Sequence, residues 1–449
     1  MGMPVDRLLI WVGDGHAATL NNLGDGFELS YTQWWQDRDG YAFSPHLPIG
    51  ESTRGAAVRN FFSNLLPEGH ALESLSRAQQ VSKHDVFGIL KKVGRDCAGA
   101  LVLAEEGQPP DTTNNACQSV SMLELHQRIV ESRLEDVPLM LWKGKRRMSL
   151  AGVQNKLGVY LTMDSGIELP VDAAPTSHIL KVGDPKHADI AANEYFCMQL
   201  ARAVGLDVPD TLFMKLPEPV LLVQRYDRLW DMAVPGGLRR IHQIDGCQAL
   251  NLSPEQKYEE PPYEYAPPGA NAADLVRLAK LCRIPARAQT TLLNWFLFNF
   301  LIGNSDAHAK NISFLVDPLR RVQKGHELER GMSVAPLYDL VCGAMYGYHD
   351  MAQTIGGESN FAVLEQTHWV QFAKDCAVPP VLLERLAAGL LKRMKQVLPR
   401  IADDVAKKTS AVLVPELQRW VAGQCERLEL GLGARTGAGR SSPKGTLTS

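Results

Sequence analysis

The sequence lacks closely spaced cysteines. It contains eight cysteines, no two of them nearer than 20 residues along the chain, and no C-x-x-C pair. This spacing excludes zinc ribbons and thioredoxin-like redox motifs. In a chain of 449 residues, scattered cysteines are typical of small buried side chains in a reducing compartment.

Long apolar runs and a large net charge are missing as well. The most apolar window, residues 292–303, is too short to span a bilayer and contains two asparagines. No secretory signal is expected from the N-terminal residues. Lys and Arg number 47 against 50 Asp and Glu, which excludes a cationic coat for nucleic acid over the whole chain. We therefore expect a cytoplasmic protein that spans no membrane.

The composition is that of a globular protein, with 45% hydrophobic and 22% charged residues, and the length allows roughly two to four domains. Residues 105–118 form a polar linker. Residues 253–270 contain five prolines, which indicates a surface loop or an interdomain hinge. The pattern before this proline-rich segment is rich in strands, and the pattern after it is almost wholly helical.

Periodicity and breaker residues predict the individual elements. The expected strands are at 7–12, 27–31, 98–103, 156–163, 177–181 and 220–225. The expected helices are at 85–93, 121–131, 189–204, 272–283, 287–303, 379–397 and 413–428, with a further helix end within 61–69.

The strongest local signal for function is the string GNSDAHAKN at residues 303–311. It stands between an apolar helix and a strand-like run, which indicates an exposed functional loop. Asp306 and Asn311 have the D-x-x-x-x-N spacing of a protein-kinase catalytic loop. There, a carboxylate accepts the proton of the acceptor hydroxyl, and an amide oxygen binds magnesium. A loop with Asx turns explains the string equally well when it is taken alone.

A second signal is a single acid, Asp339, inside the strand-like run PLYDLV. A buried carboxylate needs a positive partner. A hydrated magnesium ion is one candidate, by analogy with the aspartate of the kinase D-F-G motif. Pairing with an arginine or capping of a helix is about as good an interpretation.

A third signal joins a strand to a helix. Lys181 ends the apolar run HILK, and Glu194 follows thirteen residues later in a helical pattern. In kinases, a strand lysine holds the α- and β-phosphates and a helix glutamate holds that lysine. A surface lysine and a solvated glutamate are the more common origin of such a pair.

A fourth signal is the string SLAGVQNK at residues 149–156, which leads into a predicted strand and follows four cations within 143–147. A short turn of small residues can present backbone N–H groups to phosphates. The string matches neither G-x-G-x-x-G nor Walker A, and a solvated basic turn is the simpler interpretation. However, the order of the four signals along the chain is that of a bilobal kinase, and this order favours the functional interpretation.

Taken together, these residues resemble the HipA-type serine/threonine kinases, which are the toxins of HipBA toxin–antitoxin pairs. The resemblance runs from about residue 7 to about residue 428 and is carried by the strings SLAGVQNK, SHILK, QRYDR, HQIDGCQ, NSDAHAKN and PLYDL. Residues 61–69 and 94–101 resemble the N-terminal subdomain of that family.

The resemblance implies a role for each matching position. Asp306 would be the catalytic base, Asn311 and Asp339 the magnesium ligands, and Glu194 the ion-pair partner of Lys181. Ser149 aligns with the serine whose autophosphorylation ejects the phosphate-binding loop and inactivates the kinase. The residues expected to bind the nucleotide are Ala151, Gly152, Val153, Gln154, Asn155, Lys156, Lys181, Gln224, Arg225, Tyr226, His308, Ala309, Lys310, Asn311, Tyr338, Asp339, Leu340 and Val341.

The resemblance also implies a fold. We expect an α+β, bilobal fold like that of a protein kinase, with an extra N-terminal α+β subdomain and an all-helical C-terminal lobe. The expected divisions are the N-terminal subdomain at 1–108, a kinase N-lobe-like region with the nucleotide loop at 119–252, a helical C-lobe with the catalytic loop at 253–430, and a tail without fixed structure at 431–449.

The cofactors implied by the resemblance are ATP and Mg2+. The implied partners are a HipB-like helix-turn-helix antitoxin, operator DNA bound through that antitoxin, and a protein substrate such as glutamyl-tRNA synthetase or another aminoacyl-tRNA synthetase. Two other functions stay open. A catalytically inactive corepressor scaffold would keep only a vestigial nucleotide pocket. A metal-dependent hydrolase would use Asp306, His308 and Asp339, although no H-E-x-x-H motif accompanies them.

Overall fold

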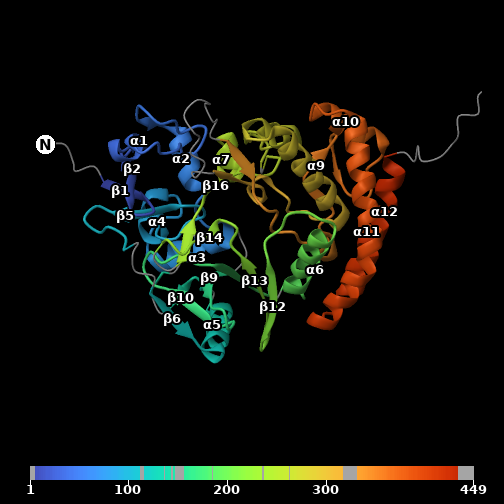
Figure 1. Cartoon of the computed structure of the whole chain (residues 1–449), viewed down its shortest axis with the longest axis horizontal. Coiled ribbons are helices and arrows are strands. Elements are labelled where there is room, and N and C mark those ends of the chain that lie inside the picture. The colour runs from blue at the N-terminus through green and yellow to red at the C-terminus, as the bar shows by residue number, and fades with distance from the viewer. Residues whose placement is uncertain are drawn as a thin grey trace, which may run out of the picture.

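The computed structural model (Figure 1) describes residues 6–111, 116–135, 137–142, 145–146, 156–184, 186–234, 237–261, 263–316 and 331–432. Ser149, residues 151–155 and the expected tail beyond residue 432 lie outside the described residues.

The N-terminal part is an antiparallel sheet with short helices around it. The strand order is β4-β3-β2-β1-β5, and β1 lies between β2 and β5. Along β3, fully buried residues alternate with half-buried ones, as expected for a strand with one face on the core. The elements are β1 (Asp6–Val12), β2 (Gly15–Asn22), β3 (Phe27–Tyr31), α1 (Gln33–Asp37), β4 (Thr53–Arg54), α2 (Ala56–Ser63), α3 (Gly69–Gln79), α4 (Val86–Val93) and β5 (Leu101–Glu105).

A six-stranded antiparallel sheet follows, in the order β12-β13-β11-β9-β10-β6. Its two faces are covered by different helices. Val220 and Leu222 on β13 belong to the hydrophobic cluster of α5, whereas Leu221 and Val223 belong to the cluster of α6. The elements are β6 (Cys117–Val120), α5 (Met122–Leu134), β9 (Lys156–Leu161), β10 (Ile167–Pro170), β11 (His178–Val182), α6 (Ile190–Ala203), β12 (Thr211–Leu216) and β13 (Glu218–Gln224).

A small three-stranded sheet combines segments from both sides of the proline-rich segment. β16 (His242–Asp245) pairs with β17 (Ser313–Val316), which pairs with β18 (Met332–Val334). The expected division at residue 252 therefore separates two strands of one sheet, and the domain limits stay predictions. Two further pairs of short strands form hairpins. β7 (Leu141–Trp142) pairs with β8 (Lys145–Arg146), and β19 (Asp350–Ile355) pairs with β20 (Glu358–Asn360).

The expectation of an all-helical C-terminal lobe is wrong, because β17 to β20 lie within residues 253–430. These strands have three to six residues, and apolar runs this short cannot be distinguished from buried helix by periodicity. The strand-like run around Asp339 is also corrected, since residues 335–342 form neither helix nor strand.

The C-terminal half is nevertheless dominated by helices. α11 packs against α6, α9 and α12, and α11 and α12 run side by side along one edge of the molecule (Figure 1). α9 is buried on nearly all sides, as its apolar sequence predicts. α11 continues through Pro399 well beyond its expected end, and α10 was not predicted. The helices are α7 (Gly246–Leu250), α8 (Ala272–Arg277), α9 (Pro285–Ile302), α10 (Gln366–Asp375), α11 (Pro380–Thr409) and α12 (Val414–Gly431).

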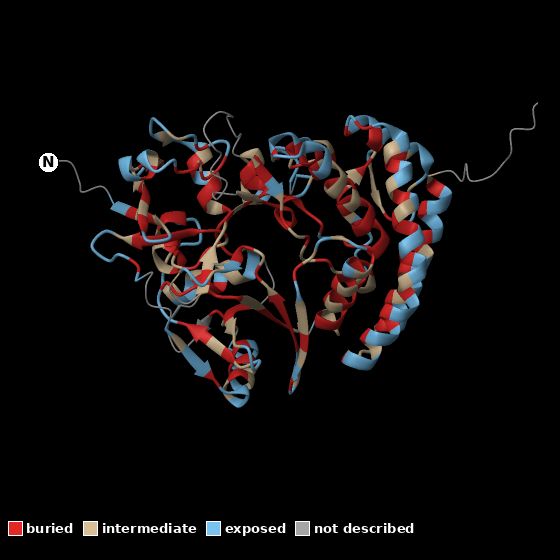
Figure 2. Ribbon diagram, in the orientation of Figure 1, coloured by how far each residue is buried: buried red, intermediate tan, exposed pale blue. Residues whose placement is uncertain are grey.

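The main hydrophobic core is shared by distant parts of the chain. One cluster of buried side chains extends from the N-terminal sheet through α6 and α9 to α11 and α12, and the six-stranded sheet has a smaller cluster with α5. Figure 2 shows buried residues along the inner elements and exposed residues on the outer faces of α11 and α12. Within the described ranges, no helix combines the length and apolar composition needed to cross a membrane.

Candidate active site

The alternation of side chains along two neighbouring strands brings two lysines to one face of the sheet. Leu180 and Val182 on β11 belong to the cluster with α5. Lys181 between them therefore faces the opposite side, on which α6 lies. Lys156 on β9 is the cross-strand partner of Lys181, so the two ammonium groups share this face.

Lys181 forms a buried ion pair with Glu194 of α6. The distance from Nζ to Oε1 is 2.6 Å, and the two side chains are 6% and 1% exposed. Burial alone would lower the pKa of Lys181, but the carboxylates of Asp339 and Glu194 raise it above its ordinary value. Burial raises the pKa of Glu194. The predicted strand-lysine and helix-glutamate pairing is present, and the interpretation as two solvated surface residues is wrong.

Asp339 binds the same lysine from the other end of the chain. Its Oδ1 forms an ion pair with Lys181 Nζ, so the positive partner expected for this carboxylate is Lys181. Burial alone would raise the pKa of Asp339, but Lys181 and Lys156 hold it below its ordinary value. The backbone of Asp339 has a φ of 51°, a left-handed conformation that costs a non-glycine residue free energy and often occurs at functional sites.

Lys156 completes this charged group. Burial has the largest effect on Lys156 and lowers its pKa to about 8. The nearby Asp339 carboxylate opposes this shift but does not cancel it. Two lysines thus stand beside two carboxylates, Glu194 and Asp339. Each charge in this group has an opposite charge nearby, which offsets part of the cost of burying it.

The loop with Asp306 begins where α9 ends. Gly303 caps the helix in the left-handed conformation, with a φ of 69°, and a Cβ there would lie 2.5 Å from Trp420 Nε1. Only glycine fits such a position without strain. The chain then turns into Asn304, which connects two parts of the site. Its Oδ1 accepts a hydrogen bond from Asp306 N, and its Nδ2 donates to Asp339 O, both at 3.1 Å.

Asn311 closes the same loop. Its Nδ2 donates a hydrogen bond of 2.7 Å to the backbone oxygen of Asp306, which leaves its carbonyl oxygen as the atom that could bind a cation. The contact between Asn304 Oδ1 and Asp306 N is an Asx turn. The loop therefore contains the Asx turn that the alternative interpretation of the string predicts. This turn also brings Asp306 and Asn311 together.

The carboxylate of Asp306 faces solvent. Its side chain is 62% exposed, and Oδ1 lies 3.7 Å from His308 Nε2. Burial lowers the pKa of His308 to about 4, so this imidazole is neutral at pH 7. Tyr258, from the proline-rich segment, donates a hydrogen bond of 2.5 Å to Asp306 Oδ1.

Lys310 directs its side chain to the N-terminal subdomain. Its Nζ lies 3.1 Å from Glu68 Oε1, 3.0 Å from Asn64 Oδ1 and 3.5 Å from Asp245 Oδ2. Its ammonium group is therefore engaged within the protein, and its predicted contact with a nucleotide stays a prediction. Ala309 is fully buried, and its N–H donates to Lys257 O at 3.0 Å.

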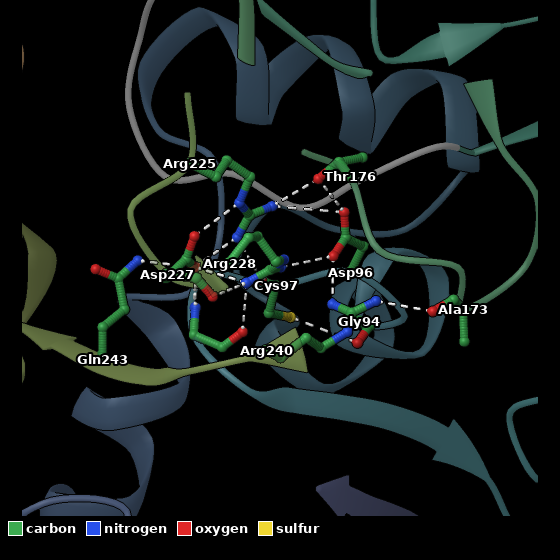
Figure 3. A network of polar contacts seen from close by, with 11 residues as sticks. Gly94, Asp96, Cys97, Ala173, Thr176, Arg225, Asp227, Arg228, Arg240 and Gln243 are labelled. Atoms are coloured by element: carbon green, nitrogen blue, oxygen red, sulfur yellow. Dashed lines mark hydrogen bonds and ion pairs between the residues drawn. The ribbon is translucent and has the colours of Figure 1, made fainter. Parts of the chain in front are cut away.

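β13 ends at Gln224, the first residue of the hinge, defined as residues 224–226, which are expected to bind the nucleotide. The next side chain, Arg225, lies in a buried ionic network (Figure 3), in which it donates to Asp227 Oδ2 at 2.7 Å and to Thr176 Oγ1 at 2.9 Å. The guanidinium group of Arg225 is therefore engaged within the protein, and so is its backbone, whose N–H donates to Ser177 O at 2.9 Å. Asp96 of the N-terminal part lies in the same network and accepts hydrogen bonds from Arg228 and Arg240. The network thus joins the N-terminal subdomain to the hinge.

Tyr226 and Tyr338 connect the hinge to the loop of Asp339. Their ring centroids are 5.3 Å apart, and the Tyr338 hydroxyl donates to Lys310 O at 2.7 Å. Leu340 is fully buried in the main core, and Val341 is half-buried. The four segments that carry the predicted site residues, around Lys181, Tyr226, Asp306 and Asp339, are thus joined by direct contacts.

Comparison with known protein families decides the family. Residues 148–407 match the HipA-like C-terminal domain, and residues 8–104 match the HipA N-terminal domain. The chain belongs to the HipA family. Its relatives are kinases, and they confirm the expectation that the chain is an enzyme. It is 33% identical to "Putative kinase Y4mE" of Sinorhizobium fredii over 90% of this chain and 94% of that protein.

Two further relatives support the HipA assignment. The serine/threonine-protein kinase toxin HipA of Shewanella oneidensis is 30% identical over 90% of this chain and 91% of that protein. The solved complex of HipA, HipB and operator DNA from Shewanella oneidensis MR-1 gives a TM-score of 0.79 at 28% identity, over 94% of this chain and 97% of that one. The chain therefore has the HipA fold over nearly its whole length.

Several residues of this HipA-family site were not predicted from the sequence. Asn304 and Tyr258 lie within segments that the sequence singled out, but no spacing indicates their contacts with Asp306 and Asp339. Glu68 is far from the site in sequence and reaches Lys257 at 2.7 Å as well as Lys310. In the part of the chain that the structure describes, no three His, Cys, Asp or Glu side chains are grouped for a metal ion, so the hydrolase alternative gains no support.

Proposed function

We propose that this HipA-family chain is an ATP- and magnesium-dependent kinase that transfers the γ-phosphoryl group to a serine or threonine hydroxyl. The observation that carries this proposal is the buried contact of Lys181 with both Glu194 and Asp339. In kinases, the lysine–glutamate pair and the metal-binding aspartate must both be in place for transfer. Asn304 ties this group to the loop of Asp306.

Asp306 would accept the proton of the acceptor hydroxyl. Its exposed carboxylate can be reached from solvent, and an ionised carboxylate has the acceptor sites that the role requires. Asn311 and Asp339 would hold Mg2+ through an amide oxygen and a carboxylate, which are the hard oxygen ligands that this ion prefers. When bound, the ion would neutralise charge on the β- and γ-phosphates.

The two lysines would hold the remaining phosphate charge. Lys181 and Lys156 project from adjacent strands on the α6 face of the sheet. The main chain from Gln224 to Tyr226, with Tyr338, Leu340 and Val341, would surround the base and sugar. Residues 151–155 as a phosphate-binding loop and Ser149 as an autophosphorylation site are further parts of the proposal, on the strength of the family resemblance alone.

We further propose that the chain is the toxin of a type II toxin–antitoxin pair. HipA of Shewanella oneidensis, which shares the fold over 94% of this chain, was solved with HipB and operator DNA. By analogy, this chain would bind a HipB-like helix-turn-helix antitoxin and reach operator DNA through it. An aminoacyl-tRNA synthetase as substrate and a cytoplasmic location remain predictions.

The test is transfer of labelled phosphate from [γ-32P]ATP with Mg2+ to the chain itself and to added protein acceptors. The wild type should incorporate label, and Asp306→Gln should incorporate none while keeping the wild-type unfolding midpoint and ATP affinity. Wild-type turnover by Asp306→Gln would show that the base is assigned wrongly. A wild type that neither binds ATP nor incorporates label would favour the inactive corepressor scaffold.

A further inference from the structure

The proline-rich segment places one hydroxyl group beside the Asp306 carboxylate. Tyr258 donates to Asp306 Oδ1 at 2.5 Å, within the range of a strong hydrogen bond to an ionised carboxylate. The other close group, His308 Nε2, is 3.7 Å away, too far for a hydrogen bond. Across the described residues, Tyr258 is the one side chain that donates a hydrogen bond to this carboxylate. A carboxylate this exposed would otherwise sample several rotamers.

The ring of Tyr258 has two further contacts. The ring meets the His308 ring edge-on, with centroids 5.2 Å apart. Lys257 Nζ lies 5.1 Å from the centroid of the Tyr258 ring and forms an ion pair of 2.7 Å with Glu68. The aromatic ring is therefore fixed by contacts that do not involve its hydroxyl.

The backbone around Tyr258 is anchored as well. Lys257 O accepts hydrogen bonds from Ala309 N at 3.0 Å and from Gln353 Nε2 at 3.2 Å. On the other side, the Glu259 carboxylate accepts from Thr354 N at 2.6 Å and from Thr354 Oγ1 at 3.0 Å. The segment is thus fastened to the catalytic loop before Tyr258 and to β19 after it, and the hydroxyl is pre-organised toward Asp306.

Toward the Asp306 carboxylate the hydroxyl acts as the donor. Burial and the adjacent Asp306 carboxylate raise the pKa of Tyr258 well above its ordinary value, so the phenol keeps its proton. An ionised carboxylate has two oxygens and about four lone-pair sites. The contact with Tyr258 engages Oδ1 and leaves Oδ2 for another hydroxyl.

We infer that Tyr258 is a positioning residue, which fixes the Asp306 carboxylate through Oδ1 so that Oδ2 is directed to the acceptor hydroxyl. This role rests on the proposed function, in which Asp306 is the base. A base that is held in the productive orientation raises the rate of transfer without changing nucleotide binding. The role was hidden in a segment that the sequence marked only as a loop or hinge.

The test compares the wild type with Tyr258→Phe, which removes only the hydroxyl group. Tyr265→Phe is the matched control, because Tyr265 lies in the same segment and is 88% exposed. The measured quantities are the initial rate of 32P incorporation into the chain at saturating ATP, the half-saturating ATP concentration and the unfolding midpoint. We expect Tyr258→Phe to lower the saturated rate about tenfold, with the other two quantities unchanged and Tyr265→Phe equal to the wild type.

Each other outcome overturns the inference in a recognisable way. An unchanged rate in Tyr258→Phe would show that the hydroxyl does not position the base, and a higher rate would show that it competes with the acceptor. A lower rate together with a lower midpoint, a weaker affinity for ATP or failure to fold would show a structural role only. If the wild type incorporates no label, the proposed function fails, and the inference fails with it.

Discussion

At the scale of single residues, the site depends on the buried charges of Lys181 and Glu194. Lys181→Met would leave the carboxylate of Glu194, which is 1% exposed, without its cation. We expect this variant to lower the free energy of unfolding by about 3–5 kcal/mol and to abolish ATP binding. Chemical denaturation and nucleotide titration measure the two effects.

A double variant separates stability from function at this position. Lys181→Met with Glu194→Leu replaces both charges of the pair by apolar groups, so part of the stability should return, although Asp339 still lacks Lys181, and ATP binding should stay absent. Lys215→Met is the control, because Lys215 Nζ contacts only the surface residue Ser410 among the contacts described. A Lys181→Met variant as stable as the control would contradict the account of the buried pair.

Glu68 makes the free energy of unfolding depend on pH in the acid range. Burial alone would raise the pKa of Glu68, but Lys310 and Lys257 lower it from 4.5 to about 2. Because the folded pKa is below the unfolded one, this carboxylate stabilises the native state above about pH 4.5, and the contribution is lost as the pH falls toward 2. The size of the contribution is about 3 kcal/mol.

Glu68→Gln should therefore remove this part of the pH dependence. We expect the variant to be less stable than the wild type at pH 6, with the difference shrinking toward pH 2. Unfolding free energies measured across this range check the sign. Glu73→Gln, which alters an exposed pair with Lys83, is the control and should follow the wild type closely. A constant difference at every pH would contradict the assignment to Glu68.

What could be predicted at this scale depended on sequence distance. The thirteen-residue step from Lys181 to Glu194 and the five-residue step from Asp306 to Asn311 are local and carry a recognisable spacing. The contacts of Asp306 with Tyr258 and of Asp339 with Lys181 join residues 48 and 158 positions apart. Such pairs are set by the packing of whole elements, which no local pattern encodes.

At the scale of elements, the end of α9 sets the start of the loop that carries Asp306. Gly303→Ala would place a Cβ in a left-handed residue and 2.5 Å from Trp420. We expect a loss of stability of at least about 1–2 kcal/mol and slower phosphate transfer, because Asn304 and Asp306 follow directly.

The matched control is Gly423→Ala in α12, where a Cβ would meet nothing within 4 Å. A helical alanine in place of glycine stabilises by roughly 0.5–1 kcal/mol, so the two variants should change the thermal midpoint in opposite directions. A midpoint for Gly303→Ala equal to or above the wild-type value would show that the cap does not need glycine.

Elements with a strong pattern were predicted well. The strands and helices around Lys181, Glu194 and residues 285–302 have nearly the expected limits, since their apolar spacing is clear. β13 likewise covers residues 220–224 of the strand predicted at 220–225. β17 coincides with the strand-like run that follows the loop of Asp306. The short strands β18 to β20 and the helix α10 were missed, because three to six residues give too little periodicity and α10 has few buried residues.

At the scale of the whole molecule, the ionic network of Figure 3 couples the N-terminal subdomain to the hinge. Asp96 accepts from Arg228 at 3.0 Å and from Thr176 at 2.8 Å, and it also pairs with Arg240. Asp96→Asn would leave buried guanidinium groups with too little negative charge. We expect a loss of about 3–5 kcal/mol that changes little with salt, because the group is buried.

Asp172→Asn is the comparison variant, because it alters an ion pair on the surface instead of a buried one. Asp172 pairs with Arg95 at 2.6 Å, but both side chains are at least one-third exposed. This variant should cost less than about 1 kcal/mol. Denaturation at low and high salt compares the two, and equal costs for Asp96→Asn and Asp172→Asn would mean that the network does not hold the subdomain to the hinge.

We propose that Asn311 and Asp339, from separate loops, bind one metal ion beside the triphosphate held by Lys181. The most direct test is a crystal structure with a non-hydrolysable ATP analogue and Mn2+, whose anomalous scattering locates the metal. We predict a peak about 2.0–2.3 Å from oxygens of both side chains, with the phosphates at Lys181. A nucleotide bound with its metal remote from Asn311 and Asp339 would contradict the account.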